Sequence, residues 1–149
     1  METKMQSKIR PITEQDREVL LEMMRKFYSS PAVFSNGSEE IFQADINNCL
    51  VGSPYLEGYV FEDGKTVQGY AMVAKSFSTE FGKPCIWIED LYIQADFRGL
   101  GIGNMFLHYI ENKYPDSILR LEVEAENERA VSVYKKFGFT TLPYMEMKK

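Results

Sequence analysis

The sequence has few of the residues that cross-link a small protein or bind a metal. It contains 2 cysteines, 1 histidine and 1 tryptophan in 149 residues. Cys49 and Cys85 both lie among apolar residues and in no metal-ligand spacing, so we expect two free, buried thiols in a reducing compartment. The histidine, His108, falls inside a predicted helix, and we expect it to be non-catalytic. The sequence therefore argues against a disulfide scaffold and against a metal site.

Long apolar runs and an excess of basic residues are absent too. No segment approaches the roughly 18 apolar residues of a membrane span, and the N-terminal METKMQSKIRPI has no apolar signal core. Lys and Arg number 17 against 22 Asp and Glu, a formal net charge of −5. Nucleic-acid and acidic-membrane binding both need a basic face. We therefore expect a cytoplasmic protein with no nucleic-acid or membrane partner, and the acidity is compatible with a cationic small molecule.

The composition that remains is that of one globular domain, residues 1–149. Hydrophobic residues make up 44% and charged residues 26% of a chain long enough for a full core. Hydrophobic periodicity and turn residues predict the following order of elements. The order is a strand at 8–12, helices at 17–28 and 39–51, a hairpin over 55–77, a strand at 84–93, a helix around 102–110, a strand at 118–125, a helix at 127–138 and a terminal strand within 139–149. This order predicts an α/β (α+β) fold with helices on both faces of a mixed, mostly antiparallel sheet.

The segment DFRGLGIGNMF, residues 96–106, places three glycines directly before a helix. Each glycine costs about 0.5–1 kcal/mol relative to alanine in regular structure, so its presence needs a reason. Backbone N–H groups at a helix N-terminus bind anions where no side chain blocks the approach. The P-loop and dinucleotide patterns both fail, because Asn104 and Phe106 stand where those patterns need other residues. A tight turn that binds nothing remains the structural alternative.

The segment Arg98–Gly103 resembles the Arg/Gln-x-x-Gly-x-Gly/Ala signature of the GNAT superfamily of acyl-CoA-dependent N-acyltransferases. The strand IEDLYI before it and LEVEAENERAVSVYKKFGF after it are similar to the neighbouring family segments. The similarity runs from Lys8 to the C-terminus, and the stretch around Glu89–Gly103 also resembles diamine and polyamine acetyltransferases. The resemblance implies the GNAT fold, with a central sheet of six to seven strands.

The resemblance also implies acetyl-CoA as the cofactor. In the family the glycine turn wraps the pyrophosphate of coenzyme A, and the preceding strand pairs with pantetheine. Asn127 contacts the cofactor in the family and also fits a helix N-cap, and the two roles are compatible. The implied cofactor-binding residues are Leu91, Tyr92, Ile93, Arg98, Gly99, Leu100, Gly101, Ile102, Gly103, Asn104, Asn127, Ala130 and Tyr134.

Acetyl transfer to an amine needs a base for an ammonium of pKa about 10.4 and an acid for the leaving thiolate. The resemblance gives Tyr134 the role of the acid, although its helical spacing with Ala130 and Phe137 also fits packing. It gives Glu89 the role of the base, often through water. Glu89 and Asp90 interrupt an apolar strand, where a carboxylate is costly unless it is paired or hydrated. Either an internal ion pair or hydrogen bond explains them, or the strand opens into a substrate cleft with Asp90 as an anchor.

We expect the acceptor pocket beside the segment joining the first two helices and beside the hairpin. The candidate substrate-binding residues are Tyr28, Phe34, Asn36, Glu80, Asp90 and Tyr92. The sequence thus predicts an acetyl-CoA-dependent N-acetyltransferase that acts on a polyamine-like or amino-acid-like primary amine by direct attack in a ternary complex. Two alternatives remain: a peptide or protein N-acetyltransferase, and a CoA-binding sensor or interaction module without turnover. A homodimer is compatible with the resemblance.

Overall fold

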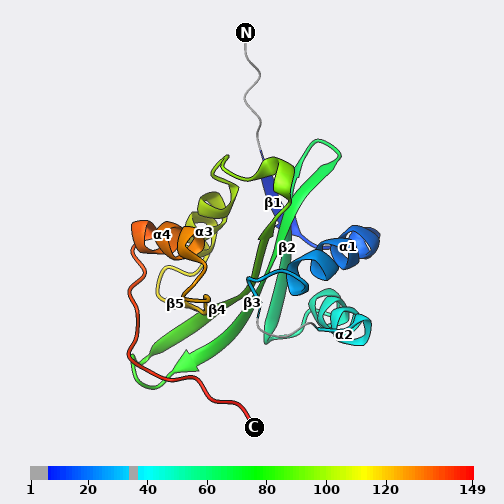
Figure 1. Ribbon diagram of the computed structural model, residues 1–149. Helices are drawn as coiled ribbons and strands as arrows, with labels where there is room; N and C mark the ends of the chain where they lie inside the picture. Colours follow the sequence, from blue (N-terminus) through cyan, green and yellow to red (C-terminus); the bar gives the residue numbers. More distant parts are fainter. Residues whose placement is uncertain (1–6, 34–36) are drawn as a thin grey trace.

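The computed structural model describes residues 7–33 and 37–149. In these residues a single sheet has the strand order β1-β2-β3-β4-β5 (Figure 1). Its first four strands are antiparallel, and β5 joins β4 in parallel. The strands are β1 (Lys8–Pro11), β2 (Leu56–Asp63), β3 (Thr66–Ser78), β4 (Lys83–Ile93) and β5 (Ile118–Leu121). The helices are α1 (Arg17–Tyr28), α2 (Glu39–Leu50), α3 (Ile102–Lys113) and α4 (Glu128–Phe137), with 3-10 turns η1 (Glu14–Asp16) and η2 (Ala95–Phe97).

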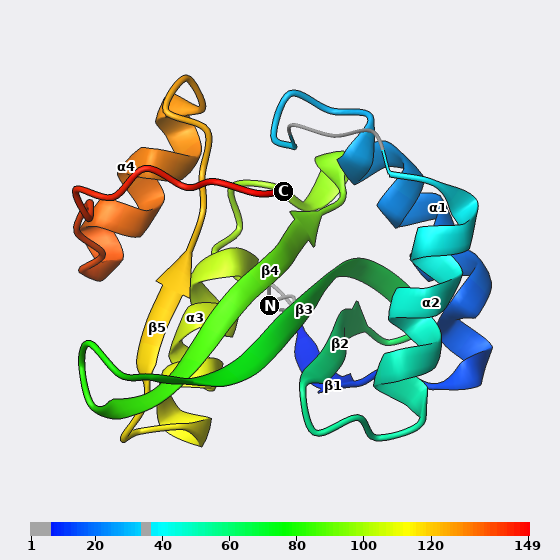
Figure 2. The ribbon, with the colours of Figure 1, turned by 90° about the horizontal axis from the view of Figure 1, so that it is seen from below.

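Helices cover both faces of the sheet, α1 and α2 on one side and α3 and α4 on the other (Figures 1 and 2). The α1–α2 layer buries side chains that include Leu20, Met24, Ile46, Val60 and Met72. The α3–α4 layer buries side chains that include Phe61, Val73, Ile88, Phe106 and Ile110. Burying each such side chain stabilises the fold by about 1.5–3 kcal/mol. The predicted fold class, with a mostly antiparallel sheet between two helical layers, is confirmed.

The sheet has five strands rather than six to seven, because the predicted terminal strand at 139–149 does not form. Pro143 in this segment has no backbone N–H to donate to a ladder. Met145 and Met147 are each 85% exposed, so the segment gains little apolar burial along the sheet. The predicted strand at 118–125 is also shorter and ends at Leu121.

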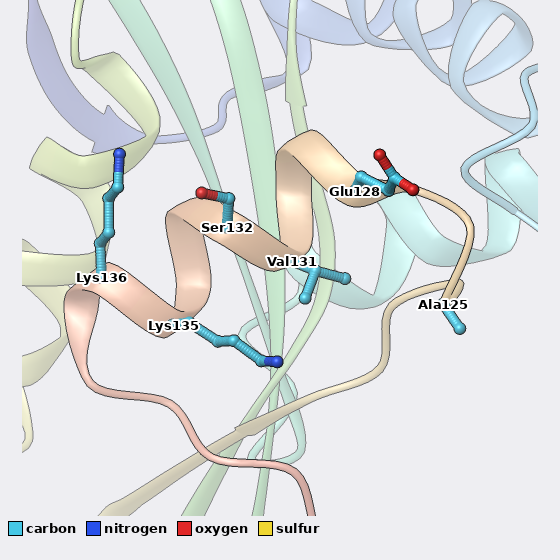
Figure 3. A pocket seen from close by; sticks show the side chains of 6 residues that line it. All are labelled: Ala125, Glu128, Val131, Ser132, Lys135 and Lys136. Atoms are coloured by element: carbon cyan, nitrogen blue, oxygen red, sulfur yellow. The ribbon is translucent and has the colours of Figure 1, made fainter.

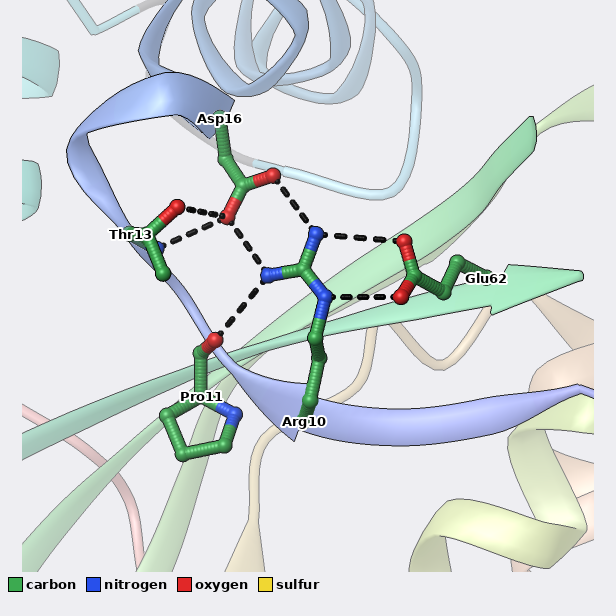
Figure 4. A network of polar contacts seen from close by, with 5 residues as sticks. All are labelled: Arg10, Pro11, Thr13, Asp16 and Glu62. Atoms are coloured by element: carbon green, nitrogen blue, oxygen red, sulfur yellow. Dashed lines mark hydrogen bonds and ion pairs between the residues drawn. The ribbon is translucent and has the colours of Figure 1, made fainter. Parts of the chain in front are cut away.

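A polar network joins β1, η1 and β2, and Figure 4 shows its members. The Arg10 guanidinium donates to both oxygens of buried Asp16 at 2.8 and 2.9 Å and to Glu62 at 2.8 and 3.1 Å. Asp16 also accepts from the backbone N–H of Thr13 at 2.7 Å. Burial opposes ionisation of Asp16, but the hydrogen bonds from Arg10 and Thr13 outweigh it and lower the pKa of this carboxyl. The network fixes the angle at which the chain enters α1.

Both thiols are free, and Cys85 is buried as predicted, whereas Cys49 is only half-buried. Burial raises the pKa of Cys49 to about 12, so this thiol stays protonated at neutral pH. No helix within the described ranges is long and apolar enough to cross a membrane.

Candidate active site

A β-bulge in β4 sets the direction of the central carboxylates. Met72 of β3 pairs with Asp90, but the next residue of β3 pairs with Ile88, so Glu89 is one residue in excess. A bulge of this kind changes which face the following side chains occupy. Ile88 packs in the α3–α4 layer, whereas Tyr92 packs in the α1–α2 layer although both hold even positions. The bulge therefore turns Asp90 toward α1 and leaves Glu89 exposed.

The edge of β4 opens at the same point. Its parallel pairing with β5 ends at Ile88 and Leu121, and beyond it the two strands diverge (Figure 2). Among the described residues, no strand pairs with β4 on this side from Glu89 to Ile93. An unpaired strand edge offers N–H and C=O groups to an extended ligand. This edge is where the resemblance places pantetheine, on the backbone around Leu91 and Ile93.

The glycine turn that follows begins α3. Gly99 and Gly101 have φ of +79° and +82°, a conformation that favours glycine. Gly101 is the N-cap and offers no side-chain oxygen, and the first N–H with an acceptor inside the helix is that of Met105, at 2.9 Å from the Gly101 carbonyl. The N–H groups of residues 102–104 therefore have no acceptor inside the helix and are available to an anion.

The turn also has room for a ligand to approach its backbone. A Cβ added to Gly101 would meet no atom within 4 Å, and one added to Gly103 would only touch Leu91 Cδ2 at 4.0 Å. Gly103 lies inside the helix without a positive φ. Neither chain conformation nor packing therefore explains glycine at position 103. Open space beside uncapped N–H groups fits the pyrophosphate of coenzyme A.

Two predicted residues lie at the N-cap and within α4, Asn127 and Tyr134. Asn127 caps the helix, accepting from the N–H of Ala130 at 3.4 Å. Tyr134 is half-buried, with its ring 5.8 Å from that of Phe139, and no hydrogen bond joins its hydroxyl to another described residue. Burial raises the pKa of Tyr134, which keeps the phenol protonated at neutral pH. The ring packs among apolar side chains, as the packing alternative predicted, and the hydroxyl remains free to donate a hydrogen bond.

Asp90 is held by two tyrosines. Its side chain is buried at 3% exposure, and its oxygens accept from Tyr28 at 2.8 Å and from Tyr70 at 2.7 Å. Burial raises the pKa of Asp90 to about 6, and the two hydrogen bonds partly offset this effect. Tyr70 is not predictable as a partner of Asp90 from the sequence, because its approach depends on a strand register that the sequence does not specify.

Further carboxylates lie near Asp90. Although the Glu89 side chain is exposed, the protein around it partly desolvates the carboxyl and raises its pKa, and the charges of Asp90 and Glu146 raise it further. Asp45 on α2, also missed from the sequence, has a pKa raised by burial and by Glu89. Partial desolvation of the carboxyl and a hydrogen bond shared with Glu146 raise the pKa of Glu122, an exposed residue just beyond β5, to about 7. No basic side chain of the described residues contributes to these shifts, so nearby carboxylates lie without a neighbouring cation.

Not all predicted substrate residues join this group. Phe34 and Asn36 lie outside the described residues. Glu80 lies in the turn between β3 and β4, where it accepts a hydrogen bond from Tyr144. Glu89 lies six positions after Lys83, the residue of β4 at the turn, and six steps along an extended strand span roughly 20 Å. The structure therefore brings Tyr28 and Asp90 together but does not bring Glu80 to them.

An open groove of about 470 Å³ lies along α4, and Figure 3 shows the side chains that line it. These are Ala125, Glu128, Val131, Ser132, Lys135 and Lys136. With 3.6 residues per turn, Glu128, Ser132 and Lys136 of this lining face away from Ala130 and Tyr134. The groove is therefore separate from the site between β4, α3 and the sheet side of α4.

Comparison with known proteins identifies this arrangement. The sequence pattern of the Acetyltransferase (GNAT) family matches residues 17–139, a range that includes the bulge, the glycine turn and α4. The chain belongs to this family. The family resemblance predicted from the sequence is confirmed, and so is the prediction of an acetyl-CoA-dependent N-acetyltransferase.

Individual GNAT proteins agree with the assignment. A thialysine N-epsilon-acetyltransferase of Bos taurus is 34% identical over 118 residues, covering 73% of this chain and 68% of its own. A protein of the same name from Sus scrofa is 30% identical over 149 residues, covering 93% and 86%. A predicted acetyltransferase from Clostridium acetobutylicum, solved with acetyl-CoA, shares the fold at a TM-score of 0.73 and 19% identity, covering 96% of both chains.

Proposed function

We propose that this GNAT protein transfers the acetyl group of acetyl-CoA to a primary amine of a small cationic molecule in a ternary complex. The observation that carries the substrate class is the buried Asp90 carboxylate, held by two tyrosine hydroxyls beside Glu89, with no lysine or arginine of the described residues paired to either carboxylate. A cationic amine would supply the missing counter-charge. The names of the curated relatives, which act on the ε-nitrogen of thialysine, support a small amine rather than a protein.

The cofactor supplies an activated acetyl thioester, and the chain supplies its binding surface. The N–H groups at the start of α3 suit the pyrophosphate, and the unpaired edge of β4 suits the pantetheine arm. The proposed contacts are those implied by the family: Leu91, Tyr92, Ile93, Arg98, Gly99, Leu100, Gly101, Ile102, Gly103, Asn104, Asn127, Ala130 and Tyr134. Cytoplasmic location and a homodimer stay predictions.

In the proposed chemistry Glu89 takes the proton of the ammonium group, directly or through one water. The bound cofactor would supply an activated acetyl group, whose C–S bond would break as the amine nitrogen forms the new C–N bond. Tyr134 would donate its proton to the leaving thiolate, and the second proton that the nitrogen loses on becoming an amide would return to the Tyr134 phenolate. The raised pKa of Glu89 favours proton uptake, and the raised pKa of Tyr134 keeps the donor protonated. Asp90, fixed by Tyr28 and Tyr70, holds negative charge beside the amine.

A substrate panel analysed by product mass spectrometry tests this function. It contains thialysine, lysine, a linear diamine, a triamine, a neutral-chain monoamine and a lysine-containing peptide, each with acetyl-CoA. We expect the small amines that carry a second charge to be acetylated faster than the monoamine and the peptide. Preference for the peptide would favour a protein N-acetyltransferase, and CoA binding without any acetylated product would favour a sensor.

A further inference from the structure

A second arginine, Arg129, lies beside the glycine turn. It belongs to α4 rather than to the turn itself. The Nη2 atom of Arg129 lies 3.7 Å from the position that a Cβ on Gly99 would occupy, and it is the one contact found there within 4 Å. The resemblance to the family did not single out Arg129. The fold thus brings the first turn of α4 to the phosphate-binding turn, thirty residues earlier in the chain.

The two arginines at this turn are engaged differently. Arg98 donates its Nε to the Ile93 carbonyl at 2.9 Å, and its guanidinium lies 5.6 Å from the centre of the Tyr92 ring. Arg98 is therefore turned back onto the end of β4. Arg129 is exposed, and no hydrogen bond or ion pair joins it to another residue of the described chain. Its donors remain available at the turn.

The place of Arg129 on its own helix is unfavourable for stability. It is the second residue of α4, directly after Asn127 and Glu128. A cation in the first turn of a helix is repelled by the positive end of the helix dipole. An unpaired arginine at this position therefore lacks a structural reason within the chain.

We propose that Arg129 binds the pyrophosphate of coenzyme A from the side opposite the N-terminus of α3. The N–H groups of residues 102–104 would hold one side of the diphosphate, and the planar guanidinium of Arg129 would donate two parallel hydrogen bonds to the other. Binding of the anion would also neutralise the charge that α4 disfavours. The inference rests on the proposed use of acetyl-CoA.

Calorimetric titration of three proteins with CoA and with dephospho-CoA, which lacks the 3′-phosphate, tests the proposal. The proteins are the wild type, Arg129→Gln, and Lys135→Gln, which removes one charge from the groove face of the same helix. We expect Arg129→Gln to bind both ligands about tenfold more weakly, because one charge-assisted contact is lost. The control should match the wild type. Arg129→Lys, which keeps the charge without the fork, should lose less than Arg129→Gln.

Two further measurements separate a phosphate contact from a structural role. The kcat/KM of Arg129→Gln for acetyl-pantetheine, which has no phosphate, should equal that of the wild type, and the melting temperature of the free variant should be equal or higher. Unchanged CoA affinity, an equal loss with acetyl-pantetheine, or a loss confined to the 3′-phosphorylated ligand would each overturn the proposal. Failure of the wild type to bind CoA would instead overturn the proposed function, and the inference with it.

Discussion

Asp90 is a buried carboxylate whose partners are two hydroxyl groups rather than a cation. Tyr28 comes from α1 and Tyr70 from β3, so the three side chains link the helical layer to the sheet beside the candidate active site. Neutral donors stabilise a buried charge less than an arginine does, which is why burial still dominates the pKa of Asp90. Part of the free-energy cost of desolvating the Asp90 carboxylate therefore remains, and a bound ammonium group would offset it.

The raised pKa of Asp90 predicts a dependence of stability on pH. The folded value of about 6 lies above the ordinary 3.8, so the folded protein binds the proton more tightly than the unfolded chain. The contribution of Asp90 to the free energy of unfolding therefore falls as pH rises from about 4 to about 6 and is constant above that range. Urea unfolding should show the wild type losing stability relative to Asp90→Asn over this window.

The isosteric asparagine keeps the site paired, because either tyrosine hydroxyl can rotate to accept from its amide. Asp116→Asn, at an exposed position between α3 and β5, is the control and should keep the wild-type slope. The account of Asp90 fails if Asp90→Asn and the wild type change in parallel.

Tyr134 is the residue proposed as the general acid, and its hydroxyl can be removed by a single substitution. Tyr134→Phe should lower kcat by about 100-fold, because a general acid is lost, and should leave the affinity for acetyl-CoA within about twofold of the wild type. Tyr109→Phe removes a hydroxyl elsewhere in the same α3–α4 layer, where its ring packs on Phe106, and serves as the control. Equal turnover of Tyr134→Phe and Tyr109→Phe would remove the acid role from Tyr134.

Among the elements, β4 and the start of α3 define the site together. The bulge at Glu89 coincides with the end of the β4–β5 pairing at Ile88 and Leu121, and the glycine turn then begins α3 a few residues beyond the opened edge. The sequence predicted both strands and the turn, but a bulge depends on the partner strand and is not visible in a single strand's pattern.

A substitution at Gly103 tests whether the cofactor occupies the open space at the turn. Gly103→Ala should raise the free energy of unfolding by about 0.5 kcal/mol, because alanine fits this helical position without a clash. The same change should weaken CoA binding, because the methyl group fills the space beside the N–H groups. Urea unfolding and CoA titration measure the two effects, which have opposite signs.

Gly101→Ala is the matched variant, since it places a side chain at φ +82° and should destabilise the protein by about 1–2 kcal/mol. Gly103→Ala with full CoA affinity would show that no ligand occupies this space.

For the whole molecule, local signals predicted more than long-range ones. The glycine turn, the cap at Asn127 and the helical layers follow from short patterns, and the structure has all of them. Asp45 and Arg129 were missed because each reaches the site through packing between elements distant in sequence. Glu80 was expected at the site from its place in the chain, yet the length of β4 separates it from Glu89.

The central claim is that this chain uses acetyl-CoA to acetylate a small cationic amine. Initial rates of CoA thiol release, measured at fixed acetyl-CoA while the concentration of each amine is varied, test it most directly. The account predicts a saturable, amine-dependent rate well above hydrolysis for at least one small diamine or lysine-like amine, with a lower rate for the neutral-chain monoamine. A protein that binds CoA but releases thiol at the hydrolysis rate with every amine would contradict the account.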